Sequence, residues 1–255
     1  MIPTESLVMR SYGASHVGRR RQSNEDAFLC DDELGLWIVA DGMGGHAAGE
    51  VASLESVDTI YGMIKRGKPG LPATEPVTEE CLQAARRLLE GAVQAATYLV
   101  YGMAEQDADK AGMGTTISAM INVGDNLVIA QVGDSRIYRV RSTHVEQLTE
   151  DHTLINWQLK HGLITEQEAK FSRKRNVITR AVGNRDYVQV DIQVYEADLG
   201  DQYLLCSDGL HGYLTLDEIP ELAASGGQQS VERFIEIANQ RGGKDNITAV
   251  LVEVC

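Results

Sequence analysis

Acidic residues recur in this sequence where apolar, strand-like runs begin or end. Asp41 follows the run GLWIVA and precedes a glycine-rich turn within VADGMGGHAAGE. The other acidic residues with such a placement are Glu25, Asp26, Asp134, Asp208 and Asp245. A single Asp-Gly at a strand end is most often a turn, because both residues favour turn conformations. Asp41 alone would be interpreted as a turn or a helix cap, but the repetition at separated places favours one shared site.

Carboxylates held at strand ends are suited to hard divalent cations. Mg²⁺ and Mn²⁺ take oxygen ligands in near-octahedral geometry and retain several waters. Glycine beside a carboxylate lets a backbone carbonyl or a bridging water approach the ion. Several carboxylates in one cleft repel one another unless a cation neutralises them. We therefore expect a cleft that binds two or more metal ions.

The run GRRRQ places cations near the first acidic pair. Arg21 lies five residues before Asp26. An arginine beside a metal–carboxylate cleft is suited to an oxyanion such as phosphate, which its guanidinium grips with two parallel hydrogen bonds. The alternative is a solvated surface arginine, and spacing alone does not show which of the three consecutive arginines points inward.

Composition and charge narrow the class of protein. The chain has 255 residues, of which 43% are hydrophobic and 24% charged, as in globular proteins. No run is long enough to span a membrane, and the first residues lack the pattern of a secretory signal. We therefore expect a cytoplasmic protein that binds no membrane. The net charge of −14, with only three or four cations in each basic cluster, disfavours nucleic-acid binding.

Strand-like segments come in runs and helical segments in pairs, which predicts an α+β fold with antiparallel sheets. The predicted strands span residues 7–15, 27–30, 36–40, 115–123, 126–132, 136–141, 145–148, 188–195, 202–206 and 247–254. The predicted helices span residues 46–64, 79–106, 153–161, 165–169, 216–224 and 230–239. The proline-rich segment 65–78 is too short to tether two domains, so we expect a single domain over residues 1–255.

Seven motifs occur in an order and at a spacing that resembles the bacterial branch of the metal-dependent protein phosphatases, the type 2C Ser/Thr class. They are GRRRQSNEDAF, VADGMGGHAAGE, MGTTISAM, VGDSRIYRV, ITRAVG, LLCSDGL and KDNITAV, and they extend over nearly the whole chain. The resemblance implies a four-layer α-β-β-α sandwich of two antiparallel sheets flanked by helix pairs. That architecture agrees with the order of the predicted elements.

The resemblance also implies metal ligands, matched motif by motif. Asp41 would bridge two core ions, Mn²⁺ or Mg²⁺, and Gly42 would lend its backbone carbonyl to one of them. Asp208 and Asp245 would complete the other ion's ligands. Asp134 would help to hold a possible third ion, with Asp208 on its other side. Glu25, Asp26 and Asn246 would lie behind these ligands without binding an ion, and Glu25 and Asp26 would orient metal-bound waters.

The implied reaction is hydrolysis of phosphoserine or phosphothreonine by direct attack of a metal-bridging hydroxide. Arg21 falls at the phosphate-gripping position, and no phospho-enzyme is needed. Animal members carry a His where this chain has Met43. The acid that protonates the leaving oxygen would then be His46 or a metal-bound water, although His46 is equally well explained as a residue at a helix N-terminus.

The resemblance extends to a flap-like segment and to partners. Residues 163–187 resemble the family's mobile flap, with Phe171 and Ser172 where bacterial relatives often have His-Pro. Substrates would be phosphorylated proteins, a cognate bacterial Ser/Thr kinase is expected, and the chain would act as a monomer. Two alternatives stay open: a catalytically silent relative that binds a phosphoprotein, and a phosphatase for small phosphate esters.

Overall fold

The strands form two antiparallel sheets that face each other, in a computed structural model that describes residues 7–44, 48–71, 77–172, 174 and 177–255. The first sheet has the strand order β1-β11-β10-β7-β8. Its strands are Met9–His16, Ile247–Val254, Gln202–Cys206, Arg136–Arg141 and His144–Gln147. The second has the order β2-β3-β5-β6-β9, with β4 paired to β3. Its strands are Asp26–Asp31, Leu36–Met43, Ile117–Val123, Asn126–Val132, Asp191–Glu196 and, for β4, Gly114–Thr115.

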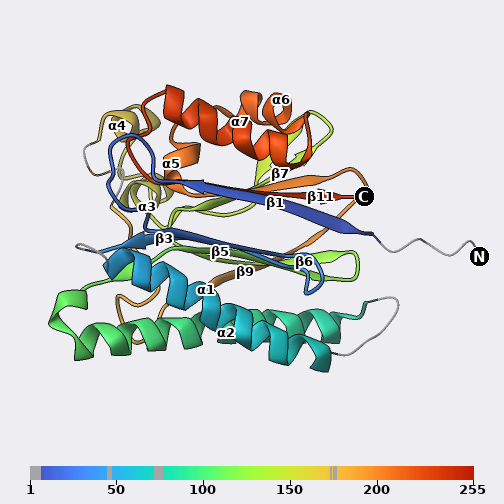
Figure 1. Cartoon of the computed structure of the whole chain (residues 1–255), viewed down its shortest axis with the longest axis horizontal. Coiled ribbons are helices and arrows are strands. Elements are labelled where there is room, and N and C mark those ends of the chain that lie inside the picture. Colours follow the sequence, from blue (N-terminus) through green and yellow to red (C-terminus); the bar gives the residue numbers. More distant parts are fainter. Residues whose placement is uncertain (1–6, 45–47, 72–76, 173, 175–176) are drawn as a thin grey trace, which may run out of the picture.

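Helices cover both outer faces of the sheet pair (Figure 1). The long helices α1 (Ala48–Gly67) and α2 (Glu79–Gln106) cover the second sheet. The first sheet is covered by α6 (Ile219–Ala223) and α7 (Gly227–Gln240). The short elements are α3, α4 and α5 with three 3₁₀ turns, at Leu154–Lys160, Glu166–Phe171, Asp208–His211, Lys68–Gly70, Ala108–Lys110 and Leu216–Glu218. The predicted four-layer α-β-β-α sandwich is confirmed.

Strand β3 shows why the layers stack. Trp37 and Val39 point into the core between the two sheets, where Tyr203 and Val250 of the first sheet also pack. Ile38, the residue between them, points to the opposite face and packs with α1 and α2. Because successive side chains of a strand alternate between faces and both faces here are buried, the run is continuously apolar.

Most predicted elements agree with the structure, although the predicted helix 216–224 is a 3₁₀ turn followed by α6 and the predicted strand 188–195 begins at Asp191. Three further differences fall near the acidic residues. Strand β3 continues past the predicted end at residue 40 to Met43, so Asp41 lies within a strand. The predicted strand 115–123 is interrupted at Thr116. Asp208, expected in a turn, is the first residue of the one-turn helix α5. A local sequence pattern does not distinguish a β-turn from a single turn of helix, because Asp-Gly can begin either.

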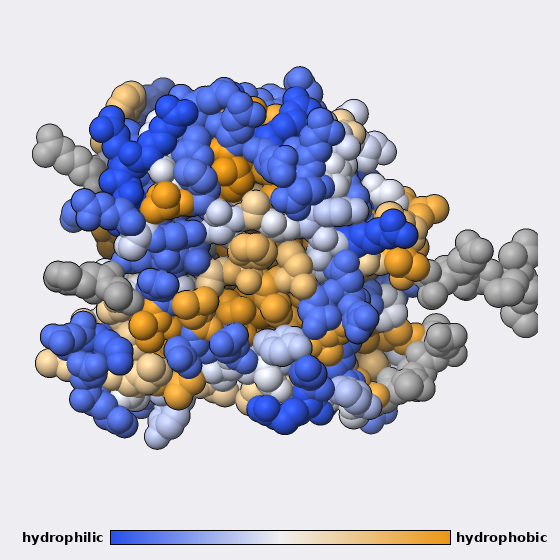
Figure 2. All heavy atoms as spheres, in the orientation of Figure 1, coloured by the Kyte–Doolittle hydropathy of each residue, from blue (hydrophilic) through white to orange (hydrophobic). Residues whose placement is uncertain are grey.

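The surface carries both polar and apolar regions. Figure 2 shows an apolar band across the middle of the viewed face, between more polar regions above and below it. Among the helices that the structure describes, none is both long and apolar enough to cross a membrane.

Candidate active site

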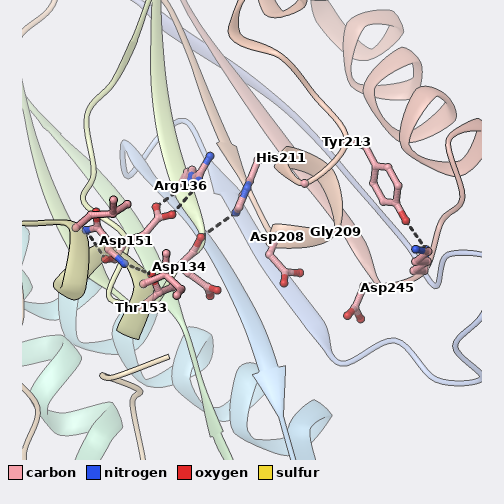
Figure 3. A pocket seen from close by; sticks show the side chains of 14 residues that line it. Asp134, Arg136, Asp151, Thr153, Asp208, Gly209, His211, Tyr213 and Asp245 are labelled. Atoms are coloured by element: carbon pink, nitrogen blue, oxygen red, sulfur yellow. Dashed lines mark hydrogen bonds and ion pairs between the residues drawn. The ribbon is translucent and has the colours of Figure 1, made fainter. Parts of the chain in front are cut away.

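The acidic residues singled out in the sequence gather at one end of the two sheets. In the first sheet, Cys206 at the end of β10 is paired with Arg136 at the start of β7. Asp208 and Asp134 therefore flank neighbouring strand ends, and Asp245 precedes the adjacent strand β11. These three aspartates line one pocket of about 520 Å³. Figure 3 shows their carboxyl groups in a row across it.

The second sheet brings Asp26 and Asp41 directly opposite each other, because β2 and β3 pair in that register. Burial raises the pKa of Asp41 well above its usual range, and the carboxyl groups of Asp26 and Asp208 raise it further. Burial also raises the pKa of Asp26 to about 7, although two hydroxyl groups oppose the shift. Like charges opposite each other in a sheet are destabilising, so this pair needs a neutralising partner.

Asp26 joins the two sheets. Its Oδ2 accepts hydrogen bonds from Ser207 Oγ at 2.8 Å and Thr248 Oγ1 at 2.6 Å, both from the first sheet. Its Oδ1 is buried and has no hydrogen-bond partner among the described residues. A buried oxygen without a donor is costly, and a bound water or ion would satisfy it.

The remaining carboxyl groups of the site are destabilised as anions for the same reasons. Burial and the neighbouring Asp208 raise the pKa of Asp134 to about 7. Burial, followed by the charge of Asp245, raises the pKa of Asp208. A cluster of carboxyl groups that resist ionisation in the absence of a cation is suited to bind one.

Arg21 is the arginine of the GRRRQ run that reaches this cluster. Its Nη2 donates to Asp245 Oδ2 at 2.8 Å, while about half of its side chain stays exposed (51%). Arg19 and Arg20 are exposed. A guanidinium has five N–H donors, so Arg21 retains donors for a further anion.

Asn246 holds the turn that carries Arg21. Its Oδ1 accepts from the backbone N–H of Glu25 at 2.8 Å. Its Nδ2 donates to the backbone carbonyls of Val17 at 3.1 Å and Ser23 at 2.9 Å. Every hydrogen bond here joins residues more than 200 positions apart in the chain, so Asn246 fixes the position of this turn against the start of β11.

Gly42 and Glu25 lie where the start of α1 meets β3. A Cβ atom on Gly42 would stand 2.2 Å from the carbonyl oxygen of Gly49 and 2.4 Å from that of Glu25, so no other residue fits. The carboxyl group of Glu25 lies against Gly49 in the first turn of α1. Burial raises the pKa of Glu25 although Arg21 opposes the shift.

Comparisons with known proteins match nearly the whole chain, including the acidic residues of the site. Residues 12–252 match the family model described as Protein phosphatase 2C. The chain is 38% identical over 241 residues to "Serine/threonine phosphatase stp" of Listeria innocua, and the match covers 92% of each chain. This chain belongs to the protein phosphatase 2C family.

Solved structures agree with this assignment. The crystal structure of the Mycobacterium tuberculosis serine/threonine phosphatase PstP/Ppp has a TM-score of 0.84 at 35% identity, covering 97% of this chain and 99% of that one. The catalytic domain of PstP in complex with two manganese ions has a TM-score of 0.83 at 33% identity, covering 98% and 99%. The chain is therefore a metal-dependent protein serine/threonine phosphatase, as its motifs predicted.

The donor set of this phosphatase fits a hard divalent cation. The gathered groups are carboxylates, the ligands that Mg²⁺ and Mn²⁺ prefer, and Asp26 contributes an unpartnered buried oxygen. Among the described residues, no three His, Cys, Asp or Glu side chains enclose an ion by themselves. Waters and backbone oxygens must then complete the coordination, as is usual for Mg²⁺. The ligand roles of individual residues stay predictions.

Two groups at the pocket of the phosphatase were missed in the sequence. His211 Nε2 lies 2.9 Å from the carbonyl oxygen of Asp134, so its N–H ties α5 to the loop before β7 (Figure 3). Arg136 donates two hydrogen bonds to Asp151, at 2.9 and 2.6 Å. The only signal for Asp151 was the polar stretch TEDHT after a predicted strand, which resembles any loop, and the stretch LHGYL around His211 carries no signal.

Two predictions fall wholly or partly on residues outside the described part of the phosphatase. His46 lies outside it, and so do residues 173, 175 and 176 of the flap-like segment. The described part of that segment contains α4 and ends in a well-anchored stretch. There, Arg180 donates to Asp191 at 2.6 Å, and His152 lies 3.0 Å from the same carboxylate.

Proposed function

We propose that this phosphatase hydrolyses phosphoserine and phosphothreonine in proteins at the pocket lined by Asp134, Asp208 and Asp245. Water accepts the phosphoryl group directly, with no phospho-enzyme. The observation that carries this proposal is the gathering of carboxyl groups from both sheets at one end, with raised pKa values and an arginine beside them. Carboxylates repel a phosphate dianion, so such a pocket is suited to phosphate only when cations occupy it.

The ions are assigned to specific residues. Asp41, Gly42, Asp208 and Asp245 hold two core ions, and Asp134 with Asp208 holds a third. Manganese in the structure of PstP supports Mn²⁺, and Mg²⁺ prefers the same oxygen ligands. When bound, the ions neutralise phosphoryl charge and lower the pKa of a water.

The protein's own groups bind and orient the reactants. Arg21 uses the N–H donors not engaged by Asp245 to hold two phosphoryl oxygens, which stabilises charge that develops on them. Glu25 and Asp26 accept hydrogen bonds from waters and thereby orient them. Asn246 keeps Arg21 in reach by fixing its turn. The proton for the leaving oxygen is assigned to His46 or to a water.

Organisation and partners complete the proposal. The whole chain, residues 1–255, acts as a single catalytic domain and as a monomer. The flap-like segment 163–187 lies beside the cleft and contacts the substrate, which is supported by Asn156 and Leu159 of the preceding helix α3 lining the same pocket. The physiological opponent is a bacterial Ser/Thr kinase.

The test is hydrolysis of a phosphothreonine peptide with Mn²⁺, with EDTA, and by the variants Asp208→Ala and Asp58→Ala with Mn²⁺. Asp58 is an exposed residue of α1 and serves as the matched control. We expect activity with Mn²⁺ in the wild type and in Asp58→Ala, and its loss with EDTA and in Asp208→Ala. A wild type inert with both Mn²⁺ and Mg²⁺ would favour the silent phosphoprotein-binding role. Faster hydrolysis of free phosphometabolites than of the peptide would favour small esters.

A further inference from the structure

Three exposed cations lie beside the pocket of this acidic protein. The chain has a net charge of −14, yet Arg19, Arg20 and Lys244 are all exposed at one place. Within the described part of the chain, none of the three forms an ion pair, because the ion pairs found there involve other residues. We call these three residues the cationic ledge.

The ledge is formed by two segments that are far apart in sequence and touch in space. The backbone N–H of Arg19 donates to the carbonyl oxygen of Gly243 at 2.7 Å. Gly18, with φ of +80°, packs so closely that an added Cβ would lie 2.2 Å from the carbonyl oxygen of Asp245. Lys244 itself lines the pocket together with Asp245. The ledge therefore adjoins the proposed metal site.

Both segments are held in place before any substrate arrives. The backbone N–H of Gly18 donates to His16 Nδ1 at 2.9 Å, and Asn246 Nδ2 donates to the carbonyl of Val17. On the other segment, the backbone N–H of Lys244 donates to Tyr213 Oη at 3.1 Å. A fixed backbone lowers the entropy cost of binding at these side chains.

Three other cations around the pocket, all in the described part of the chain, have carboxylate partners. Arg21 pairs with Asp245, Arg136 with Asp151, and the nearby Arg241 with Glu218. The ledge differs from these three arginines, because no carboxylate of the described residues forms an ion pair with it. Such charge on an acidic protein attracts anionic groups locally while the rest of the surface repels them.

We propose that the cationic ledge binds a second anionic group of the substrate, next to the phosphorylated residue that is hydrolysed. The inference rests on the proposed function and adds a substrate class to it: phosphoproteins with an acidic or a second phosphorylated residue near the scissile site. Lys244 adjoins Asp245 and Arg20 adjoins Arg21 in the chain. Because neighbouring Cα atoms lie about 3.8 Å apart, the anion is expected within about three residues of the scissile one.

The experiment compares three peptides that share one phosphothreonine. One has glutamines at the flanking positions, one has glutamates there, and one has a single additional phosphoserine. Each is tested with Mn²⁺ against the wild type and the triple variant Arg19→Gln/Arg20→Gln/Lys244→Gln. A matched control, Arg10→Gln/Arg66→Gln/Arg87→Gln, removes the same charge from exposed residues of β1, α1 and α2 that do not line the pocket.

The quantity measured is the ratio of kcat/KM for each anionic peptide to kcat/KM for the glutamine peptide. We expect a ratio of about three to five in the wild type and the control variant, and about one in the ledge variant, because exposed ion pairs contribute little each. Raising the ionic strength should lower the wild-type ratio, because salt screens exposed charges. If only the phosphoserine peptide is preferred, the ledge is specific for a phosphate group. If both anionic peptides are preferred, the ledge binds anionic groups in general.

Two results would overturn the inference without touching the proposed function. One is a wild-type ratio near one while the glutamine peptide is hydrolysed in a Mn²⁺-dependent way. The other is an undiminished preference in the ledge variant or, if the triple variant does not fold, in the double variant Arg20→Gln/Lys244→Gln. Failure to hydrolyse any peptide would instead refute the proposed function, and the inference with it.

Discussion

Strands β7 and β10 carry acidic residues at both ends, and the two ends differ in kind. At one end, Asp134 and Asp208 face other carboxyl groups, and burial raises their pKa values. At the other end, the buried Asp201 accepts two hydrogen bonds of 2.7 Å from Arg141, one of 3.0 Å from Tyr203 Oη and one from a backbone N–H. These bonds outweigh burial and lower the pKa of Asp201.

The difference between the two ends lies in what neutralises a buried carboxylate. An aspartate whose cation is supplied by the chain itself stabilises the fold, whereas an aspartate surrounded by other aspartates is unfavourable until a ligand arrives. Function is concentrated where the chain leaves charge uncompensated. Neutralising a carboxylate should therefore have opposite consequences at the two ends.

The largest effect is expected for Asp41→Asn at the active-site end. Activity with Mn²⁺ should fall by at least about 100-fold, because even residues behind the ligands of a metal site affect activity by up to that factor. The metal-free variant should be more stable than the wild type by about 1 kcal/mol, since a like-charge pair with Asp26 is removed. Peptide hydrolysis with Mn²⁺ measures the loss of activity, and urea unfolding in EDTA measures the gain in stability. A less stable variant would contradict the comparison.

Asp201→Asn should give the reverse pattern. The free energy of unfolding should fall by about 2 kcal/mol, because the guanidinium of Arg141 loses its buried partner, although its own partial exposure reduces the cost. Activity with Mn²⁺ should stay within twofold, roughly, since a structural pair at the far end does not touch the reactants. Urea unfolding measures the loss of stability, and peptide hydrolysis measures the retained activity. A variant as stable as the wild type would contradict the structural role assigned to Asp201.

The stabilising effect of Asp201, measured as the difference in unfolding free energy between the wild type and Asp201→Asn, should depend on pH. The folded-state pKa of Asp201 is lowered, so its contribution is fully present above the unfolded pKa of about 3.9 and is lost as the pH falls through the folded-state value. The stability difference between wild type and Asp201→Asn should therefore be constant from pH 7 to about pH 4.5 and shrink below it. Unfolding curves across this range test the sign, and a difference that grows in acid would refute it.

The smallest effect is expected for Asp198→Asn. Asp198 also pairs with Arg141, at 2.6 Å, but its side chain is 59% exposed. Exposed pairs contribute little, so the free energy of unfolding should change by less than about 0.5 kcal/mol. Measured beside Asp201→Asn, this variant separates burial from charge. An equal loss in both would show that pairing alone, and not burial, stabilises this end.

Parts of the site could be predicted because local sequence and structure agree there. Asp41 lies between an apolar run and glycines, and Gly42 is the only residue that its crowded position accepts. Neither His211 nor Asp151 could be predicted, because His211 ends the one-turn helix α5 and Asp151 lies in a loop that looks ordinary, and neither stretch carries a periodic signal. Asp208 follows a predicted strand and lines the pocket, but its helix was missed, since four residues carry no periodicity.

The order of strands and helices, the family and the residue types of the site are already legible in the amino-acid sequence. Alternating burial on both sheet faces produces apolar runs that are legible locally, and the motifs keep their spacing. The folded structure was needed to show that Arg21 donates a hydrogen bond to Asp245 and that Asp26 stands opposite Asp41. Strand register and the contact between distant loops set these distances, and burial and charge at such distances set the pKa values, so neither is a property of any short stretch of sequence.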